Sequence, residues 1–350
     1  MPIFKLTPIV SLLAIVLAAA PAGQTNAPRD PVRSFLTGQM GFTTADLSSL
    51  DAGNAVARQM KVREAVDVNI FGAVRIDAPA EAFVQQLRNI DAFERKLGIL
   101  QVSNLREPPQ PADFDGLTLE ATDVADLVEC RAGSCDLQLP ASAITKFQSE
   151  LGQRGVNTTE TSNRLFRTFL FDRLQLYRTG GLPLVGAYHD RARPIWAANE
   201  FSVLASPGDL PVDLPELTYY LRAYPNATLP GSSDVFYWNK GAFGLKPTVR
   251  LNHLVIYPMP AGAPHRVRYV VATSQIYANH YFSSTLELRS LLDDPAQPGK
   301  RFYLFYTTKS RVSGLTGVIG MLIRSKVRSR ARAGMEKYLA VTKKVMETIR

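Results

Sequence analysis

The segment from Leu315 to Ile349 reads LTGVIGMLIRSKVRSRARAGMEKYLAVTKKVMETI, and it decides the fold. It contains no proline, and its apolar side chains recur with the period of an α-helix. The pattern predicts one long closing helix with an inward-facing apolar stripe. The stripe consists of Ile323, Val327, Ala331, Gly334, Tyr338, Val341, Val345 and Ile349.

Three strand candidates precede this helix, at Lys246 to Tyr257, His265 to Phe282 and Lys300 to Lys309. Each is rich in Val, Tyr, Phe and Thr, the residues that favour extended structure. We therefore expect a curved antiparallel sheet with the long helix laid across it, enclosing a space between the two. Small side chains at Ala331 and Gly334 leave room under the helix for a close strand or for a ligand.

An earlier strand and helix are predicted from residue 66 to residue 96. The stretch VDVNIFGAVRI, residues 66 to 76, is typical of a strand. Asp77 suits a helix N-cap and Pro79 a first helical turn, so a helix should run from about Pro79 to Lys96. Ile99 to Leu105 is a further strand candidate.

The middle of the chain is helical in pattern. Pro140 to Leu151, Thr158 to Arg178 and Leu214 to Arg222 are predicted helices, and the second should end at Gly180-Gly181. We interpret residues 110 to 235 as a helical insertion. Residues 23 to 55 show weak periodicity and many Gly, Thr, Ser, Asn and Asp residues, which indicates a linker or lead-in.

The junction GAVRIDAPAE, residues 72 to 81, resembles the first strand-to-helix junction of the START-like or polyketide-cyclase superfamily. The order of strand, helix, antiparallel strands and long C-terminal helix is similar to the same group. The resemblance covers the two ends of the chain, and the helical middle is outside it. It implies an α+β helix-grip fold, in which the sheet wraps the C-terminal helix around an apolar tunnel. That tunnel commonly holds lipids, sterols, polyketides or other hydrophobic molecules, in carriers and in enzymes.

The N-terminus has the pattern of an export signal. Lys5 precedes an apolar run from Ile9 to Ala20, and small residues at Ala20 and Ala22 fit cleavage after residue 22. The run is shorter than the roughly 20 residues that span a bilayer, although an uncleaved anchor is an alternative. We predict a signal peptide over residues 1 to 22, and an exported protein that is periplasmic or secreted.

The chain has two cysteines, Cys130 and Cys135, on either side of the turn RAGS. A turn of this length brings its flanking residues close enough for a disulfide, which an oxidising compartment favours. A redox or metal pair is the alternative, but no histidine lies near in sequence. We predict a structural disulfide, no metal and no cofactor.

The formal net charge of +9 is concentrated in one run, formed by Arg324, Lys326, Arg328, Arg330 and Arg332. The hydrophobic content of 46% and charged content of 20% are those of a globular protein. The run is interpreted as a nucleic-acid patch, as a contact with an anionic membrane surface, or as a solvated helix face. Export argues against nucleic acid, and the other two interpretations stay open.

Candidate ligand-binding residues come from the predicted sheet and the closing helix. Strand alternation places Gln275, Tyr277, Asn279 and Tyr281 on one face, a mixture of polar and aromatic groups expected in a pocket or on a solvated sheet face. His253 alternates with apolar neighbours and is either a ligand contact or a packed core histidine. The remaining candidates are Tyr257, Tyr269 and Tyr338.

Three functional hypotheses follow. The first is an exported binding or carrier protein for a hydrophobic small molecule or lipid in an apolar cavity. The second is a cofactor-independent cyclase, hydratase or hydrolase of the same fold, with His253 and His280 as acid–base candidates. The third is an interaction module whose helical insertion docks a partner. No serine-hydrolase or zinc-site motif is found in the sequence.

Overall fold

A computed structural model describes residues 30–206, 214–242, 246–260 and 266–349. The predicted signal peptide and His265 lie outside these ranges. The helices are α1 (Pro31–Gly38), α2 (Thr44–Asp51), α3 (Ala80–Arg88), α4 (Ile90–Lys96), the 3₁₀ turn η1 (Pro111–Phe114), α5 (Ala121–Glu129), α6 (Ala141–Leu151), α7 (Thr158–Val185), α8 (Ala197–Leu204), α9 (Pro215–Ala223) and α10 (Gly317–Thr348). The strands are β1 (Val56–Gln59), β2 (Asp67–Ile76), β3 (Gln101–Asn104), β4 (Ala187–Tyr188), β5 (Ile195–Trp196), β6 (Ser233–Gly241), β7 (Thr248–Pro258), β8 (Val267–Ala278), β9 (Phe282–Asp293) and β10 (Phe302–Val312).

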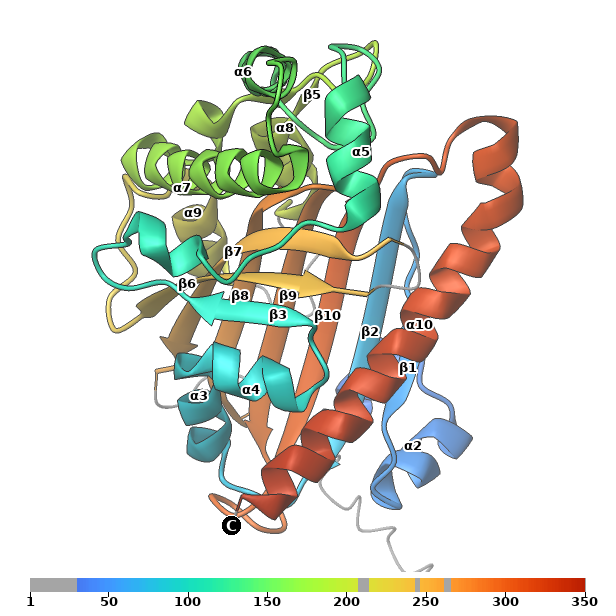
Figure 1. The fold of residues 1–350 in the computed structure, drawn as a ribbon. Helices are drawn as coiled ribbons and strands as arrows, with labels where there is room; N and C mark the ends of the chain where they lie inside the picture. The colour runs from blue at the N-terminus through green and yellow to red at the C-terminus, as the bar shows by residue number, and fades with distance from the viewer. Residues whose placement is uncertain (1–29, 207–213, 243–245, 261–265, 350) are drawn as a thin grey trace, which may run out of the picture.

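The fold is α+β, built on one curved antiparallel sheet of eight strands and the long helix α10 (Figure 1). The strand order is β1-β2-β10-β9-β8-β7-β6-β3. β2, from the start of the chain, pairs along its length with β10, from the end, with Gly72 opposite Tyr306. β3 pairs with β6 at the other edge. The insertion between these two strands therefore leaves the sheet continuous.

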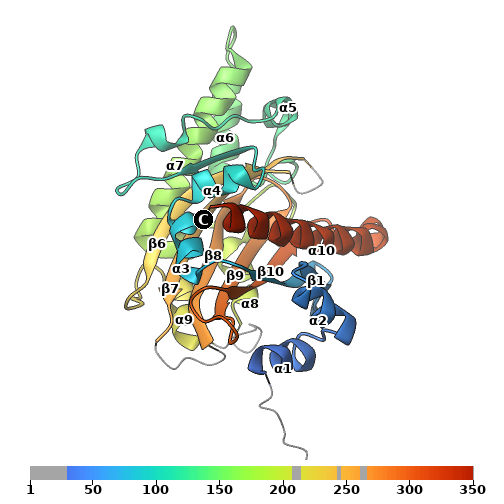
Figure 2. The same cartoon turned by 90° about the horizontal axis from the view of Figure 1, so that it is seen from below.

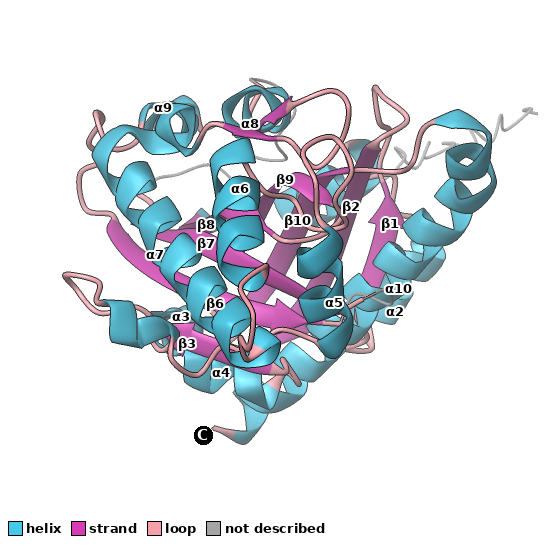
Figure 3. Ribbon diagram, turned by 45° about the horizontal axis from the view of Figure 1, so that its top comes forward, coloured by secondary structure: helices cyan, strands magenta, loops and turns pink. Residues whose placement is uncertain are grey.

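Both faces of the sheet are covered, which explains why β7, β8 and β9 are buried almost throughout. We call the face covered by α3, α4 and α10 the inner face, and the face covered by α1, α2 and the insertion helices the outer face. Figures 1 and 2 show α10 lying along the open side of the curled sheet, chiefly over β2 and β1. Figure 3 shows α6 and α7 lying across the strands near β6, β7 and β8, and their buried side chains belong to the core of the outer face.

The predicted closing helix is confirmed, but the predicted stripe is not its buried face. The buried side chains of α10 in contact with the sheet side are Met335, Leu339, Thr342 and Met346, whereas Gly334 and Ile349 are exposed. Val327, Ala331, Tyr338 and Val345 are partly buried beside them. The helix is therefore rotated relative to the sequence prediction. Its apolar residues lie on more than one side, so periodicity alone does not select the contact face.

Five strands of the sheet match their predicted positions, and three are missed. β2, β3, β7, β8 and β10 agree within a few residues with the sequence prediction, whereas β1, β6 and β9 were not predicted as strands. β9 carries Glu287 and Arg289 between leucines, and charged residues at alternate positions conceal a strand that is buried on both faces.

Residues 30 to 55 form α1 and α2, so the linker prediction is wrong for them. Phe35 of α1 is buried on the outer face, with its ring 5.5 Å from the Phe305 ring and 6.2 Å from the Phe71 ring. Thr43 and Asp46 form a capping box that starts α2. The single helix predicted from Pro79 to Lys96 is divided at Asn89 into α3 and α4.

The predicted insertion is helical, as expected, and lies between β3 and β6. The backbone of α7 is interrupted at Gly180 and Gly181, close to the predicted helix end, and Gly181 has a φ of +69°. Cys130 and Cys135 form a disulfide after α5, with their Cα atoms 4.5 Å apart. Gly133 supplies the positive φ that this short turn requires.

Gly72 is where α10 approaches the sheet most closely. A Cβ atom at this position would lie 2.6 Å from Leu339 Cδ1 and 2.8 Å from Met335 Cγ. We expect Gly72→Ala to lower the free energy of unfolding by about 1–3 kcal/mol, because α10 or its side chains must shift. Chemical denaturation measures this change, and Gly116→Ala, where nothing lies within 4 Å, is the control. Equal stabilities of the two variants would contradict the close contact.

Candidate ligand-binding site

The inner face of the sheet carries a band of buried polar side chains beneath α10 and α4. Antiparallel register places Thr273 opposite Glu287, and Arg289 opposite Tyr306, so these four share one face. Each is exposed by less than a tenth. Burying charge away from water is costly unless the charge is paired, so the contacts within this band are informative.

Glu287 lies at the centre of the band and binds two arginines. Its carboxylate accepts from Arg250 Nη1 at 3.0 Å, from Arg289 Nη2 at 2.9 Å and from the Tyr306 hydroxyl at 2.7 Å. Burial alone would raise the pKa of Glu287, but Arg289, Arg250 and the Tyr306 hydroxyl together lower it below its ordinary value. Glu287 is therefore an anion shared by two cations.

Arg289 also joins the sheet to α10. Its Nη1 donates to Thr273 Oγ1 at 3.0 Å, and its guanidinium lies 4.4 Å from the centre of the Tyr306 ring and 5.9 Å from that of Tyr338 in α10. Burial opposes the charge of Arg289, but Tyr306, Tyr338 and Glu287 raise its pKa well above the ordinary value. The guanidinium is thus a permanent buried cation that lies beside a pair of contacting aromatic rings, Tyr306 and Tyr338.

A second buried carboxyl, Glu94 of α4, behaves differently. Asn239 Nδ2 donates to Glu94 Oε2 at 2.6 Å. Burial raises the pKa of Glu94, and the Asn239 hydrogen bond and Arg250 only partly offset it. Burial therefore favours the neutral form of Glu94, and Arg250 and Arg289 share the carboxylate of Glu287.

Several side-chain atoms around this band have no hydrogen-bond partner within the protein and no appreciable exposed surface. Buried polar atoms are normally satisfied, because each unpaired one costs about 1–3 kcal/mol. Unpartnered buried atoms occur on both sides of the sheet, and those on the inner face are available to a polar group of a ligand. They are Asn239 Oδ1, Asn252 Nδ2, Gln275 Oε1, Arg289 Nε and Thr342 Oγ1.

The structure divides the predicted ligand-binding residues between the two faces. Gln275, Tyr269 and Tyr338 lie on the α10 side. Tyr281, with a φ of +59°, occupies the turn before β9 and packs at the edge of the same core. The other four lie on the outer face or against α5: His253, Tyr257, Tyr277 and Asn279.

A β-bulge explains this division. The register between β7 and β8 shifts between Leu251 and Asn252, so that Gln275 faces Asn252 while Tyr277 faces Leu251. One extra residue reverses the alternation of side chains along the strand. Tyr277 consequently packs against α7, with its ring 5.1 Å from that of Phe169. The prediction that Gln275 and Tyr277 share a face is therefore wrong.

His253 occupies an aromatic pocket on the outer face. Its Nδ1 lies 2.9 Å from the Tyr177 hydroxyl, and its Nε2 lies 3.0 Å from Asp234 Oδ1. Tyr220 donates to the other Asp234 oxygen at 2.8 Å. Burial would raise the pKa of Asp234, but the bonds from His253 and Tyr220 lower it. Both imidazole nitrogens are engaged and the ring is fully buried, so His253 presents no atom to a ligand.

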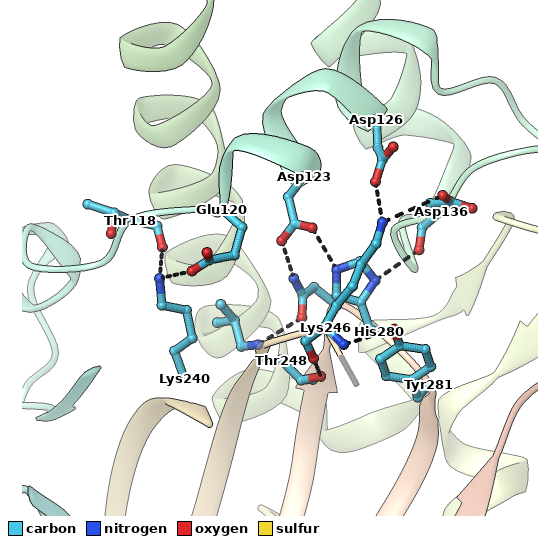
Figure 4. A network of polar contacts seen from close by, with 12 residues as sticks. Thr118, Glu120, Asp123, Asp126, Asp136, Lys240, Lys246, Thr248, His280 and Tyr281 are labelled. Atoms are coloured by element: carbon cyan, nitrogen blue, oxygen red, sulfur yellow. Dashed lines mark hydrogen bonds and ion pairs between the residues drawn. The ribbon is translucent and has the colours of Figure 1, made fainter. Parts of the chain in front are cut away.

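His280 belongs to a network that fixes α5 to the end of the sheet (Figure 4). Its Nε2 lies 3.0 Å from Asp123 Oδ1, and its Nδ1 lies 3.0 Å from the Asp136 carbonyl oxygen. Asn279 Nδ2 donates to the second Asp123 oxygen at 3.2 Å. Lys246 Nζ donates to Asp126 Oδ2 at 2.8 Å. These contacts tie the insertion to β7 and β8, which is a structural role.

A groove lies between α10 and residues 53–55, and no residue of the polar band lines it. Its volume is about 380 Å³, and it is lined by residues 53–55 and by α10 residues that include Ala340, Lys343 and Glu347. It is open to solvent and contains two lysines, Lys343 and Lys344. It is a different space from the enclosed cavity that the sequence predicts.

Sequence reasoning missed Arg250, Glu287 and Arg289. The available signal was the alternation of Glu287 and Arg289 with Leu286, Leu288 and Leu292 in β9, which places both charges on one strand face. Such a pattern usually indicates a solvated face, so only the burial of the strand identifies the charges as interior.

Within the described ranges, no cluster of His, Cys, Asp and Glu is arranged to hold a metal ion. None of the helices in those ranges is both long enough and apolar enough to cross a bilayer. No protein-family model matches this chain, and a search of curated proteins finds no significant match.

Proposed function

We propose that this chain is an exported helix-grip protein that binds or carries an amphipathic small molecule or lipid between the sheet and α10. The ligand's polar head contacts Arg289 and its neighbours in the polar band, and its apolar body lies along the inner face. The observation that carries the proposal is the buried band in which two arginines share one glutamate, with unpartnered polar atoms beneath the helix.

The strand order supports the helix-grip assignment. β2 lies beside β10, the intervening strands run antiparallel, and α10 crosses the inner face, as the resemblance implies. The Cys130–Cys135 disulfide is consistent with an oxidising compartment after export. The insertion helices cover the outer face, so they leave the inner face to α3, α4 and α10.

The charge of the band selects the kind of head group. A carboxylate or phosphate on the ligand would complement the two arginines and accept from Arg289 Nε and Asn252 Nδ2. The sequence predicts an apolar cavity, and the charged band replaces that expectation with a ligand that has one polar end. Because the unpartnered atoms have no exposed surface, α10 or α4 must move for a ligand to enter.

A carrier explains the site better than an enzyme of the same fold. The acid–base candidates His253 and His280 have both ring nitrogens occupied by protein groups. A substrate would have to displace one of these protein groups before either histidine could exchange a proton with it.

The direct experiment is purification under native conditions, extraction with organic solvent and mass spectrometry of the extract. We expect an acidic lipid or another amphipathic acid in stoichiometric amount. A clean extract, combined with no binding of a fluorescent fatty acid such as cis-parinaric acid, would contradict the proposal.

The substitution Thr342→Val should affect stability and ligand affinity in opposite directions. The Thr342 hydroxyl is buried and unpartnered, and valine has nearly the same shape. We expect the ligand-free variant to be more stable by about 1 kcal/mol, because an unsatisfied group is removed, and to bind cis-parinaric acid more weakly. Denaturation and fluorescence titration measure the two effects.

Ser162→Ala is the matched control, because the Ser162 hydroxyl is equally buried and unpartnered but belongs to α7 on the outer face. It should gain stability and keep the affinity for the fatty acid. Unchanged affinity in both variants would remove Thr342 from the binding site.

A further inference from the structure

The first two turns of α10 expose an unusual concentration of apolar side chains. Val318, Ile319, Met321 and Leu322 are 74, 74, 63 and 77% exposed, and Ile323 is 40% exposed. We call residues 318–323 the α10 tip. It projects past the end of β2, away from the body of the sheet (Figures 1 and 2). Contiguous exposed apolar groups on a soluble protein mark an interaction surface.

Gly320, at the centre of the tip, fixes which side of the helix faces the preceding turn. Gly320 is the buried position of this segment, and a Cβ atom there would lie 2.3 Å from the Leu315 carbonyl carbon. The backbone of the tip therefore packs on the preceding turn through Gly320. The large side chains on either side of Gly320 are directed outward, where no described part of the chain covers them.

Basic residues follow the tip, and the last of them, Arg332, pairs with Glu336 at 2.6 Å. Residues 317 to 335 include five basic residues and no Asp or Glu. Lys326 and Arg330 are exposed. Arg328 donates to the carbonyl oxygens of Ala65 and Asp67 and so holds this part of α10 against the start of β2. The helix thus presents an apolar end and, one to two turns later, a positive surface.

We propose that the α10 tip inserts into the interfacial region of an anionic lipid bilayer, with Lys326 and Arg330 contacting lipid headgroups. Apolar side chains enter the acyl boundary, and adjacent Lys and Arg side chains attract anionic lipids. A second copy of the chain is a poorer occupant, because pairing two tips brings two sets of cations together. The proposal is independent of ligand binding on the inner face.

The test is co-sedimentation of the purified protein with vesicles of phosphatidylcholine alone, or of phosphatidylcholine mixed with phosphatidylglycerol. We expect binding to the mixed vesicles and little binding to the neutral ones. The double variant Ile319→Ser, Leu322→Ser should lower the partition coefficient at least about tenfold, because two apolar side chains no longer enter the interface. The double variant Lys326→Gln, Arg330→Gln should lower the partition coefficient roughly tenfold or more on the mixed vesicles and leave it unchanged on the neutral ones.

Leu100→Ser with Leu184→Ser is the matched control, since both leucines are about half exposed and lie outside α10. This variant should partition like the wild type. Absence of binding to anionic vesicles, or binding that the tip variant leaves unchanged, would overturn the proposal. A wild-type dimer in sedimentation that the tip variant converts to monomer, without vesicle binding, would assign the tip to self-association instead.

Discussion

Replacing Glu287 by Gln is expected to lower the free energy of unfolding by about 3–5 kcal/mol, because two buried arginines lose their shared carboxylate. Arg250 and Arg289 lie side by side in the interior, and the carboxylate is what offsets their repulsion. Urea denaturation at neutral pH measures the change. The variant is also expected to keep less of its ordered structure at α10, which the Arg289–Tyr338 contact joins to the sheet.

Glu94→Gln is the matched control for this prediction. Glu94 is a buried glutamate on the same side of the sheet, but burial raises its pKa and thereby works in favour of its neutral form. An amide in its place should leave stability within about 1 kcal/mol of the wild type, or increase it at neutral pH. Equal losses in the two variants would show that the ion pairs of Glu287 contribute nothing beyond packing.

The two glutamates also give opposite pH dependences. The folded-state pKa of Glu287 is below its unfolded value of 4.5, so its contribution to stability is present above that pH and lost as pH falls through the folded value. The folded-state pKa of Glu94 is raised, so its contribution is present below 4.5 and lost as pH rises through the folded value. The free energy of unfolding is measured against pH for the wild type and for each Gln variant. The difference from the wild type gives the separate contribution of Glu287 or Glu94.

Asp123→Ala is the second substitution with a large expected effect, a loss of about 3–5 kcal/mol. It removes the acceptor of both His280 and Asn279, which are almost fully buried at the junction of α5 and the sheet. The cysteine turn after α5 and the Asp136 carbonyl contact with His280 should loosen with it. Chemical denaturation and limited proteolysis of the insertion measure these effects.

The neighbouring ion pair supplies a control. Lys246 is about one third exposed, so Lys246→Met should cost no more than about 1 kcal/mol despite its contact with Asp126. A double-mutant cycle with Asp123→Ala and His280→Ala should give a coupling energy well above experimental error. Strictly additive effects would argue that the two residues do not interact in solution.

The framework of the fold could be predicted from the sequence because it depends on periodicity. The proline-free segment ending at Ile349 forms α10, and the Val- and Tyr-rich stretches form β7, β8 and β10. The helical character of residues 110 to 235 was equally accessible. The cysteine pair could be identified from spacing, since a six-residue segment leaves its ends close together.

The side chains of the site could not be predicted, for physical reasons that particular residues illustrate. The bulge at Leu251 and Asn252 reverses alternation along β8 and has no sequence signal there. The contact face of α10 depends on where the sheet ends, because the apolar residues of its tip lie beyond the sheet. Glu287 and Arg289 pair with each other and with Arg250, and pairing across strands is visible only in three dimensions.

The most direct measurement of the central claim compares the affinity of the wild-type protein for cis-parinaric acid and for its methyl ester. The two probes share an apolar body and differ only in the charge of the head. If the buried band around Arg289 binds the head group, the acid should bind at least about tenfold more tightly than the ester. Equal affinities, or no measurable binding of either probe, would contradict the account.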